Sequence, residues 1–567
     1  MRAFCTVAIL GFFYGILSLA GVCHGLGRKG GPAGELLGDG YLAGAVSSLE
    51  KVSKQPGRFR GEVANTAAID AAGNEYESYQ IVLFSPAEPL LGVHVEPTDL
   101  FCRHQQRLLT RENITVRRVA YVETRRPVYD VEFVGYWPDP LMPLEPFDVP
   151  GGVVQPIWVT VYVPENTLPG IYRGAVLIHA ENAAAETLHV ALQVWDFALP
   201  KNSHLQVVFS LYQNVIEQYY GSGTLPADIL RAYYSFLLTY RINPTNLYLS
   251  GHPQPRIEDY EYCIHRGMNA ANVAYLHDRQ GTDDAKGGFS REYREQIRST
   301  LPGIASRLRE KQWLDVAFVY GPDEPAAEQY PAIREIFTLV RESAPGLRRV
   351  LTREPTGELY GSVDVWVPRM NRYEEKTCRA RQALGEEVWW YVCARPHHPY
   401  PNFFIDYPAI DHRIIFWLTW KYDISGVLYY SLNRWITNYS SGKGRWPEVP
   451  WNTHTWGEHN GDGQLIYPGP EGLPYSSIRL EVIRDGIEDY EYLHLLERLA
   501  RELEWSRLED AETYLRSADG LIERIQERVV SRPDDYLRTN DQLLDYRRMV
   551  AGQIVRLKTI LEMSARN

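Results

Sequence analysis

The chain has 567 residues, of which 45% are hydrophobic and 23% are charged, and its formal net charge at pH 7 is -12. One hydrophobic core rarely serves more than ~250 to 300 residues, so this length predicts more than one domain. An acidic chain with a pI near 5.8 is poorly suited to nucleic acid, because that binding depends on Lys and Arg neutralising phosphates. We therefore expect no nucleic-acid partner.

The N-terminus has the pattern of a secretory signal, with Arg2 before an apolar run over residues 3–22 and small residues after it. We predict a signal peptide at residues 1–27 and a secreted or periplasmic protein. A membrane anchor is one alternative, because the run is nearly long enough to span a bilayer. A lipoprotein attached at Cys23 is another, although Val22 is larger than the residue that usually precedes such a cysteine. No later segment is apolar enough to cross a bilayer, so we expect no membrane insertion of the mature chain.

Residues 28–200 are predicted to form a β-sandwich domain. Short segments of alternating hydrophobicity are separated there by Pro and Gly, a pattern typical of packed antiparallel sheets. The predicted strands cover residues 76–85, 90–97, 114–122, 156–163, 172–180 and 187–197. The polar stretch after Pro200 marks the exit into the next domain.

Residues 201–503 are predicted to form a (β/α)8 TIM-like barrel, because strand-like apolar runs alternate there with amphipathic helical stretches. The eight predicted strands cover residues 205–212, 242–250, 270–276, 315–320, 348–352, 363–370, 388–394 and 426–432. Active sites of such barrels lie at the C-terminal ends of the strands. A long loop follows the eighth strand, at residues 434–474, and its many Trp and Tyr residues predict a wall of the pocket.

The segment at residues 475–503 is strongly helical and is predicted to be the last helix of the barrel. Its charged residues are expected to form a solvated face together with some buried pairs. These residues are Arg479, Glu481, Arg484, Asp485, Glu488 and Asp489. Residues 504–567 are predicted to form a C-terminal helical tail, with helices at residues 506–530 and 533–563.

The candidate catalytic residues are Asp323 and Glu324, two adjacent carboxylates that end the fourth predicted strand of the barrel. Neighbouring side chains of a strand point to opposite faces, so consecutive acids can serve one pocket only where the strand has ended. Pro322 and Pro325 supply that ending, because proline cannot donate to a strand ladder. A solvated pair of loop acids is the alternative.

Neither a metal site nor a cofactor site is predicted. Four cysteines follow the predicted signal peptide, at Cys102, Cys263, Cys378 and Cys393, and no two of them have the CxxC spacing of metal ligands. The histidines are also scattered along the chain. A disulfide between Cys378 and Cys393 is left open, because spacing does not establish a pairing.

Seven segments of the chain are similar to one family of proteins. They are NEYESYQIVLF and VWDFALP in the first predicted domain, then YGPDEP, PYPNFF, GVLYYSLNRW, DGQLIYPGP and SIRLEVIRDGIEDYEYL. On these segments the chain resembles the glycoside hydrolase family 123 catalytic-domain proteins and the related domain of unknown function 4091, over nearly its whole mature length. The resemblance implies a secreted glycoside hydrolase. It would be an exo-acting, retaining β-N-acetylgalactosaminidase that acts on a terminal 2-acetamido sugar of a carbohydrate without a cofactor.

The resemblance also implies how the two carboxylates divide the work. Glu324 would be the general acid/base, and Asp323 would hold the N–H of the substrate's 2-acetamido group, whose carbonyl oxygen attacks the anomeric carbon. An acid donor that works near neutral pH needs a raised pKa. We therefore expect apolar walls and the neighbouring carboxylate to raise the pKa of Glu324, while Asp323 stays charged.

Four further residues are candidates for binding the sugar. Tyr391 would orient the acetamido oxygen, and Trp435 would offer an aromatic platform where the family carries a tryptophan. Asn402 and Asn433 would supply polar groups around the sugar ring. Packing in the core or in a loop is the alternative for each of them.

Two other functions remain open from the sequence. The protein could hydrolyse a different sugar, or it could be a non-catalytic glycan-binding surface protein that keeps the scaffold, because a fold does not determine chemistry. The intact pair of Asp323 and Glu324 favours an enzyme.

Overall fold

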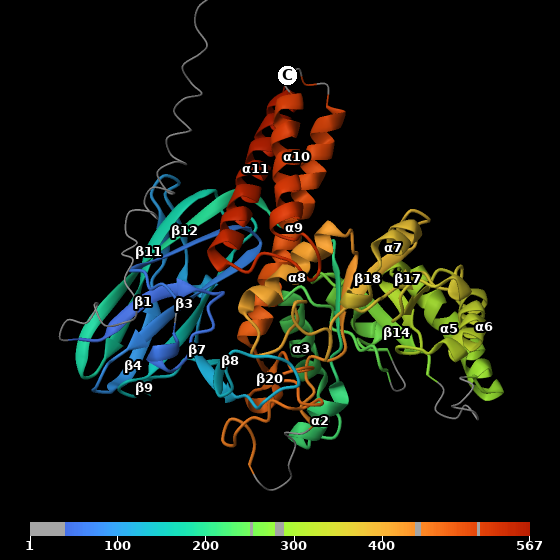
Figure 1. Cartoon of the computed structure of the whole chain (residues 1–567), viewed down its shortest axis with the longest axis horizontal. Coiled ribbons are helices and arrows are strands. Elements are labelled where there is room, and N and C mark those ends of the chain that lie inside the picture. Colours follow the sequence, from blue (N-terminus) through green and yellow to red (C-terminus); the bar gives the residue numbers. More distant parts are fainter. Residues whose placement is uncertain are drawn as a thin grey trace, which may run out of the picture.

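The computed structural model describes residues 40–59, 61–249, 253–277, 288–436, 444–506, 508 and 511–566. The predicted signal peptide and Cys23 lie outside these residues. None of the helices within them is long and apolar enough to cross a membrane. Figure 1 shows a β-rich part beside a part in which strands and helices alternate, with the C-terminal helices rising from the boundary between the two.

The N-terminal part consists of two packed sheets. Its strands are β1 (Leu42–Ser47), β2 (Thr66–Gly73), β3 (Glu75–Phe84), β4 (Leu90–Pro97), β5 (Leu100–Cys102), β6 (Arg107–Leu109), β7 (Ile114–Glu123), β8 (Tyr136–Pro143), β9 (Phe147–Val149), β10 (Val154–Val163), β11 (Gly170–Ala180) and β12 (Ala183–Ala198). They pair in the orders β1-β3-β10-β7-β8 and β2-β12-β11-β4-β9, while β5 pairs with β11 and β6 pairs with β5. Side chains from both sheets, such as Ile81 and Val176, share one apolar core, as a β-sandwich requires. All six predicted strands are present, as β3, β4, β7, β10, β11 and β12.

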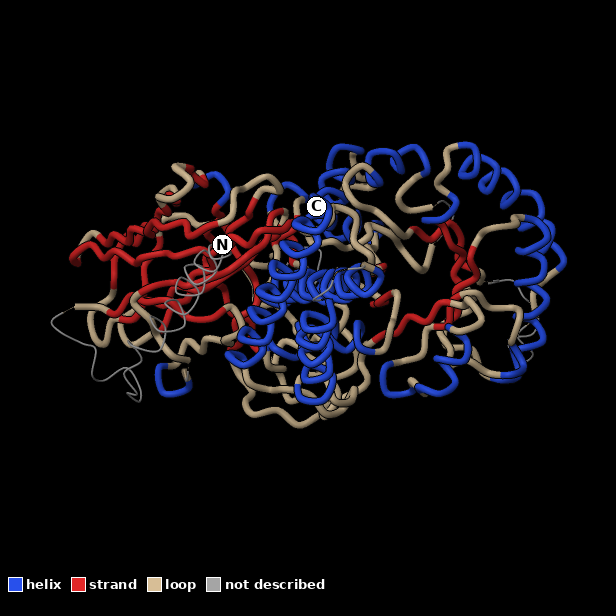
Figure 2. The backbone as a smooth tube through the Cα atoms, turned by 90° about the horizontal axis from the view of Figure 1, so that it is seen from above, coloured by secondary structure: helices blue, strands red, loops and turns tan. Residues whose placement is uncertain are grey.

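Seven parallel strands form the second part. They are β13 (Gln206–Phe209), β14 (Ala271–Tyr275), β15 (Ala317–Tyr320), β16 (Arg348–Leu351), β17 (Val365–Trp366), β18 (Glu387–Tyr391) and β19 (Gly426–Tyr429). Their order in the sheet is β13-β19-β18-β17-β16-β15-β14, and the sheet curves into a nearly closed barrel (Figure 2). Strands are thus found in seven of the eight predicted runs.

The predicted second strand of the barrel, at residues 242–250, is wrong as a regular strand. In its described part only Asn243 forms a ladder bridge, to β13. Pro244 has no N–H to donate, and side-chain hydrogen bonds supplement the few backbone bonds to β13 and link the segment to β14. Asn243 donates to a β13 carbonyl at 2.9 Å, and Asn272 of β14 donates to the Leu247 carbonyl at 2.8 Å. This segment fills the gap between β13 and β14, so regular strands alone do not complete a (β/α)8 barrel.

Helices cover the outside of the barrel. They are α2 (Gln213–Tyr220), α3 (Ala227–Thr239), α4 (Tyr260–Ile264), α5 (Arg291–Glu310), α6 (Tyr330–Ser343), α7 (Glu375–Gln382) and α8 (Ala409–Lys421). In α6, which follows β15, Ile333, Phe337 and Val340 are fully buried at helical spacing and so share one face. Between β16 and β17, where every residue is described, only a short 3-10 turn is present, Gly357–Leu359. The alternation of strand and helix is therefore incomplete there.

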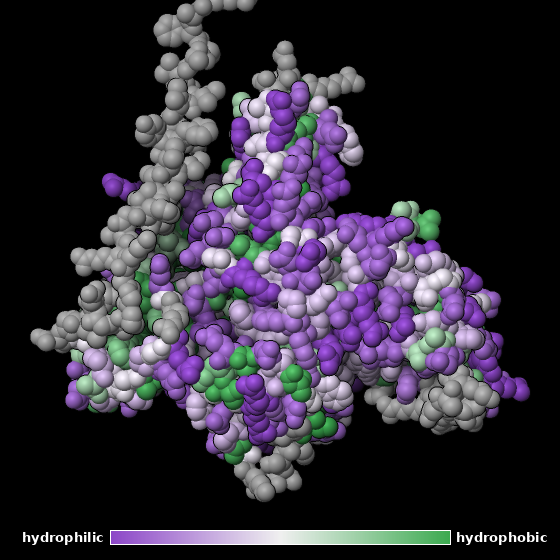
Figure 3. Space-filling view, viewed as in Figure 1, coloured by the Kyte–Doolittle hydropathy of each residue, from purple (hydrophilic) through white to green (hydrophobic). Residues whose placement is uncertain are grey.

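Three helices end the chain: α9 (Ile478–Trp505), α10 (Ala511–Arg528) and α11 (Asn540–Arg566). α9 packs against α8 and α11, and it also meets strands β3 and β8 of the N-terminal sheets. The prediction of a solvated charged face on α9 is wrong, because all six charged residues named for it are buried. Neighbouring elements pack around the first turns of α9 on several sides, so these turns are not exposed to solvent. The surface of the projecting helices is mainly hydrophilic (Figure 3).

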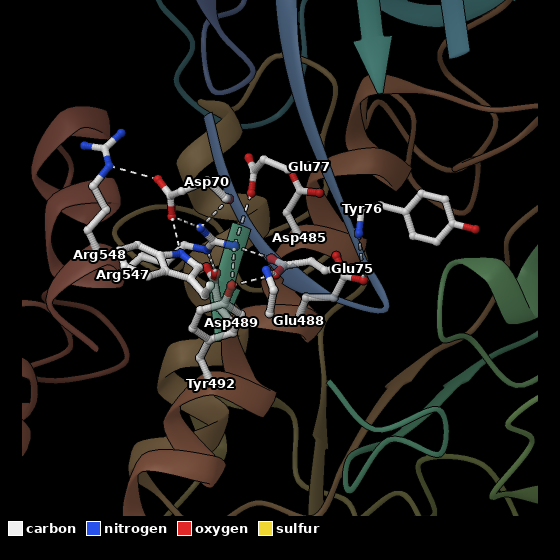
Figure 4. A network of polar contacts seen from close by, with 12 residues as sticks. Asp70, Glu75, Tyr76, Glu77, Asp485, Glu488, Asp489, Tyr492, Arg547 and Arg548 are labelled. Atoms are coloured by element: carbon white, nitrogen blue, oxygen red, sulfur yellow. Dashed lines mark hydrogen bonds and ion pairs between the residues drawn. The ribbon is translucent and has the colours of Figure 1, made fainter. Parts of the chain in front are cut away.

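The charged residues of α9 contribute to a buried group, here called the seam cluster, where sandwich, barrel and tail meet (Figure 4). Its members are Asp70, Glu75, Glu77, Arg413, Asp485, Glu488, Asp489 and Arg547. Arg547 of α11 contacts Asp70 of β2 at 2.7 Å and also contacts Glu75 of β3. On its other side it contacts Asp489 of α9 at 2.9 Å. Arg413 of α8 donates to both oxygens of Asp489, at 2.6 and 2.8 Å. These arginines connect the three parts of the chain.

Carboxylates outnumber arginines in the seam cluster, and burial beside other carboxylates raises the pKa of some of them. Burial raises the pKa of Glu75 to about 8; Arg547 opposes the rise, and Glu488 and Glu77 add to it. Burial also raises the pKa of Asp485 well above its usual value. Some of these carboxyls are therefore protonated at neutral pH, which lowers the charge that the protein must bury.

Candidate active site

The two candidate carboxylates lie at the C-terminal end of β15. Phe318 and Tyr320 of this strand belong to the core of the barrel. At Gly321 a Cβ would come within 3 Å of side chains on α6 and β16, so only glycine fits where the strand turns. Asp323 and Glu324 follow, and both are exposed to solvent. The strand thus places two adjacent acids at the edge where active sites of such barrels lie.

Three hydroxyl groups hold the carboxylate of Asp323. Tyr320 donates to Oδ1 at 2.6 Å, Thr352 donates to the same oxygen at 3.0 Å, and Tyr248 donates to Oδ2 at 3.1 Å. The donors come from β15, from the end of β16 and from the irregular segment before β14. Asp323 is therefore fixed from several neighbouring positions of the barrel.

Although Asp323 reaches the surface, the side chains packed around its carboxyl exclude water from it, and this desolvation raises its pKa. The three hydroxyl donors oppose this rise because they favour the charged form, and the neighbouring Glu324 adds to the rise. From the sequence we expected Asp323 to stay charged. Its position among tyrosine side chains instead makes ionisation costly, so the charged form depends on the donors around it.

Glu324 has a left-handed backbone conformation, with a φ of 45°. Such a conformation costs a residue with a side chain roughly 1–3 kcal/mol, and strain of this kind is concentrated at functional sites. The N–H of Glu324 donates to Thr352 Oγ1 at 2.9 Å, and its Oε1 accepts a hydrogen bond from the Tyr391 hydroxyl. Thr352 therefore contacts both acids and sets their relative position.

Tyr391, at the end of β18, is the predicted sugar-binding residue that the structure places beside the acids. Burial raises its pKa far above the usual value for tyrosine, and the hydrogen bond to Glu324 adds to the rise. Its hydroxyl thus remains a hydrogen-bond donor at neutral pH.

The other three predicted sugar-binding residues are buried, and their polar groups are engaged. Asn402 donates to two carbonyls of the loop after β18, both at 2.8 Å. Asn433 exchanges hydrogen bonds with the backbone of Tyr212, at 2.9 and 3.0 Å. Trp435 is fully buried and donates to a backbone carbonyl at 2.9 Å. In this structure the three residues hold loops together, because their amide and indole groups already have partners.

A group of tyrosines that the sequence analysis did not select lies around the acids. They are Tyr212, Tyr248, Tyr275 and Tyr320, near the ends of the first four predicted strands. The ring centroid of Tyr248 lies 6.2 Å from that of Tyr212 and 5.5 Å from that of Tyr275. The signal was present in the sequence, since each of these four runs ends in or near a tyrosine. Such rings suit the apolar face of a sugar.

The loop after β19 adds a buried carboxyl and an exposed tryptophan. Asp462 accepts hydrogen bonds from the hydroxyls of Tyr429 and Tyr430, both at 3.0 Å, and burial raises its pKa to about 6. Trp456 is 48% exposed, and the guanidinium of Arg434 lies 4.2 Å from its ring centre. Of the four tryptophans in this loop, all of which are described, only Trp456 is exposed and so available as a platform.

The four cysteines that the structure describes are all free. The disulfide considered between Cys378 and Cys393 is therefore not formed. The reason is their position: Cys378 lies in the large core beneath the barrel helices, whereas Cys393 packs against the core inside the barrel. Among the described residues, neither acid of the pair belongs to a group of three side chains that could hold a metal ion.

Adjacent carboxylates at the C-terminal ends of parallel barrel strands are an arrangement expected of a glycosidase. Comparison with protein families agrees. Residues 252–496 match the glycoside hydrolase 123 catalytic domain, and residues 54–180 match the glycoside hydrolase 123 N-terminal domain. The chain belongs to glycoside hydrolase family 123.

Solved structures show what the fold resembles. A family 123 glycoside hydrolase from Clostridium perfringens, studied for glycolipid glycan hydrolysis, matches with a TM-score of 0.66 and 16% identity, over 93% of this chain and 99% of that chain. At this identity the likeness shows a shared fold. A family 39 glycoside hydrolase from the gut symbiont Bacteroides cellulosilyticus WH2 matches with a TM-score of only 0.32 and 10% identity, over 75% of this chain and 81% of that chain. That score is too low to inform the fold. No sequence match was found among curated proteins.

Proposed function

We propose that this protein is a secreted, exo-acting β-N-acetylgalactosaminidase that retains the anomeric configuration and uses the substrate's 2-acetamido group as the nucleophile. The observation that carries the proposal is the pair of Asp323 and Glu324, both held by Thr352 at the end of a barrel strand. Ordinary retaining enzymes need carboxylates that flank the scissile bond. Two successive residues approach the sugar together, which suits one acid for the leaving oxygen and one for the acetamido group.

Glu324 is assigned as the general acid/base. In the first step its carboxyl gives a proton to the leaving glycosidic oxygen, and in the second its carboxylate takes a proton from the water that opens the oxazoline. The Tyr391 hydroxyl donates to Oε1 of Glu324 and orients the carboxyl. We assign the proton transfer to the other oxygen, Oε2.

Asp323 is assigned to orient the acetamido group and to balance the charge of the oxazolinium intermediate. An acetamido N–H would be one more donor to Asp323, beside the hydroxyls of Tyr320, Thr352 and Tyr248. Each added donor lowers the pKa that burial raises. Substrate binding thereby favours the charged form of Asp323 when positive charge develops on the sugar.

The partly exposed tyrosines at the strand ends and Trp456 are assigned to hold the sugar ring. Arg434 of the loop after β19 lies against the ring of Trp456, and the ring of Tyr212 lies 6.2 Å from that of Tyr248, which donates to Asp323. The similar family 123 enzyme from Clostridium perfringens was studied for glycolipid glycan hydrolysis. We extend this to the present chain and propose a terminal 2-acetamido sugar of an extracellular glycan, glycolipids included, as its substrate. The signal-like residues 1–27 support export.

Hydrolysis of a chromogenic β-N-acetylgalactosaminide by the purified chain tests the proposal. We expect turnover of this substrate, weaker turnover of the corresponding glucosaminide, and none of the β-galactoside, which lacks the acetamido group. Proton NMR should detect the β-anomer as the first product, and a thiazoline analogue of the oxazoline should inhibit competitively. Inversion of configuration, or equal cleavage of the galactoside, would contradict substrate assistance.

The two alternatives give different results in the same experiments. An enzyme for another sugar would cleave a different member of a panel of aryl glycosides. A non-catalytic binding protein would bind a glycan array without turnover, and Glu324→Ala would leave that binding unchanged. The strained backbone at Glu324 and the three hydroxyls on Asp323 favour an enzyme, because simple binding does not require two oriented adjacent acids.

A further inference from the structure

A second group of chemically competent side chains lies away from the acid pair. It consists of His204, Glu491 and His494, whose possible ligand atoms all lie within 4.8 Å of one another. His204 precedes β13, whereas Asp323 follows β15, and the strands of the barrel run parallel. The group is therefore at the end of the barrel opposite to the acids.

We propose that His204, Glu491 and His494 bind one divalent transition-metal ion, with zinc as the best fit, and that this ion has a structural role. Two imidazole nitrogens and one carboxylate oxygen are ligands that zinc prefers, whereas calcium and magnesium prefer oxygen alone. Three protein ligands would leave one tetrahedral position open to a water molecule.

The distances within the group are close to those that the ion needs. Zinc bonds of about 2.0–2.2 Å in tetrahedral geometry place neighbouring ligand atoms about 3.3–3.6 Å apart. His204 Nδ1 lies 2.7 Å from Glu491 Oε2, so that a proton joins them. The imidazole rings of His204 and His494 stack with centroids 3.9 Å apart. The metal would take the place of the proton that joins His204 and Glu491, and the stacked ring of His494 would have to turn one nitrogen toward it.

Glu491 is already held in the way that metal-binding carboxylates are held. Its second oxygen, Oε1, accepts hydrogen bonds from the Ser203 hydroxyl at 2.6 Å and from the His204 N–H at 2.8 Å. Outer hydrogen bonds of this kind orient a ligand and leave its other oxygen for the metal. Glu491 is buried and His204 is exposed, so the ion has access to the site from the histidine side.

Nearby arginines of α9 are paired elsewhere. Arg498 forms an ion pair with Glu502 at 2.7 Å, and Arg501 forms one with Glu497 at 3.9 Å. The ion pair of Glu491 is instead with the imidazole of His204, at 2.7 Å.

The position of the group indicates what the ion does. Glu491 and His494 are one helical turn apart on α9, whereas His204 lies 287 residues before Glu491, in the segment that enters the barrel. An ion bound by all three joins the first strand of the barrel to its last helix. The same separation explains why no metal spacing was visible in the sequence.

Zinc binding to the purified full-length chain, without an affinity tag and after treatment with a chelator, tests the proposal. Isothermal titration with zinc chloride should show one ion per chain with a micromolar or lower Kd. Affinity should fall at least tenfold in His494→Ala and in Glu491→Gln, which keeps an acceptor for Ser203. His265→Ala is the matched control, because exposed His265 pairs at 3.9 Å with a single acid, Glu261. The control should bind as the wild type does.

Cobalt(II) reports directly on the metal ligands, because its visible absorption depends on how the ion is coordinated. Loss of a contact that only stabilises the fold would not change it. In the wild type cobalt(II) should give the visible absorption bands of a tetrahedral site, and His494→Ala should abolish them while circular dichroism is unchanged. Zinc should also raise the midpoint of thermal unfolding of the wild type but not of the variant. Zinc affinity that is unchanged in both His494→Ala and Glu491→Gln would overturn the site. Loss of glycoside hydrolysis on chelation, restored by zinc, would overturn the structural role.

Discussion

The acid pair and the seam cluster both bring carboxylates close together, but they place them in opposite surroundings. Asp323 and Glu324 are exposed, and their partners are hydroxyl groups. The carboxylates of the seam cluster are buried, and arginines from α8 and α11 are their main partners. Hydroxyl donors leave a carboxyl able to exchange its proton, whereas a buried guanidinium favours the charged form of the carboxyl beside it.

Because of this difference, the acid pair should matter mainly for catalysis and the seam cluster mainly for stability. Changing an exposed acid removes a reacting group and disturbs little packing, so activity should fall while folding is kept. Removing an arginine from the seam cluster leaves buried carboxylates without their partner, so folding should suffer while folded molecules keep their catalytic site. Substitutions in the two regions should therefore give opposite results in assays of hydrolysis and of unfolding.

Glu324→Gln should cause the largest effect, a loss of about a thousandfold in kcat/KM for substrates whose leaving group needs a proton. The loss should be much smaller for a nitrophenyl glycoside, which departs unaided, and the midpoint of thermal unfolding should not change. A series of leaving groups measures this. Glu328→Gln is the control, because Glu328 is an exposed acid of the same loop. If the variant and the wild type depend on the leaving group equally, Glu324 is not the acid.

Arg547→Leu should lower the free energy of unfolding by about 3–5 kcal/mol, because the buried Glu75 loses its arginine and Asp489 keeps only Arg413. Hydrolysis per folded molecule should be unchanged. Urea unfolding of both proteins measures the first effect, and kcat measures the second.

Arg548→Leu is the control for Arg547→Leu. Arg548 contacts Asp70 at 2.9 Å but is half-exposed, so its loss should cost only about 1 kcal/mol. Equal costs for the two arginines would remove the distinction between the buried cluster and its border.

Asp323→Asn should slow hydrolysis about a hundredfold, equivalent to about 3 kcal/mol, because the oxazolinium loses its fixed counter-charge. The factor should be the same for all leaving groups, unlike that of Glu324→Gln. Asp315→Asn is the control, because Asp315 is an exposed acid just before the start of β15. Added azide that restores only the Asp323 variant would indicate that the roles of the two acids are reversed.

Tyr248→Phe removes one of the three hydroxyl donors to Asp323. That donor holds the pKa of Asp323 down, so its loss should raise the pKa further. Because Asp323 acts in its charged form, the acidic limb of the pH profile of kcat/KM should move to higher pH, with only a several-fold loss on the plateau. Tyr360→Phe, at an exposed tyrosine, should leave the profile unchanged. An acidic limb that moves to lower pH would contradict this account of Asp323.

Glu75→Gln should have the smallest effect and act on stability alone. The pKa of Glu75 is about 8 in the folded protein against 4.5 ordinarily, so the folded state holds the proton more tightly. The contribution of Glu75 to the free energy of unfolding is fully present below about pH 4.5 and is lost as the pH rises through about 8. The neutral glutamine should flatten this part of the pH dependence of the free energy of unfolding, measured in urea. Glu112→Gln, at an exposed acid, should not.

The features that depend on a few neighbouring residues could be predicted from the sequence. Alternating hydrophobicity located six strands of the sandwich, and short apolar runs located seven strands of the barrel. Two prolines placed Asp323 and Glu324 at a strand end, because a proline acts on the backbone beside it. The same local effect explains why the strand predicted at residues 242–250 is wrong: the apolar run suggested a strand, but Pro244 interrupts the ladder.

Only the tertiary structure decided which side chains are buried and which distant residues meet. The charged residues of α9 have the composition of a solvated face, and they are buried because the sandwich and α11 pack on that helix. Asn433 has the chemistry of a sugar ligand, but the backbone of Tyr212 occupies its amide. Asp323 accepts hydrogen bonds from the hydroxyls of Tyr248 and Thr352, which lie on other parts of the barrel. Burial and partner choice depend on segments far apart in the chain, and no local pattern of residues contains that information.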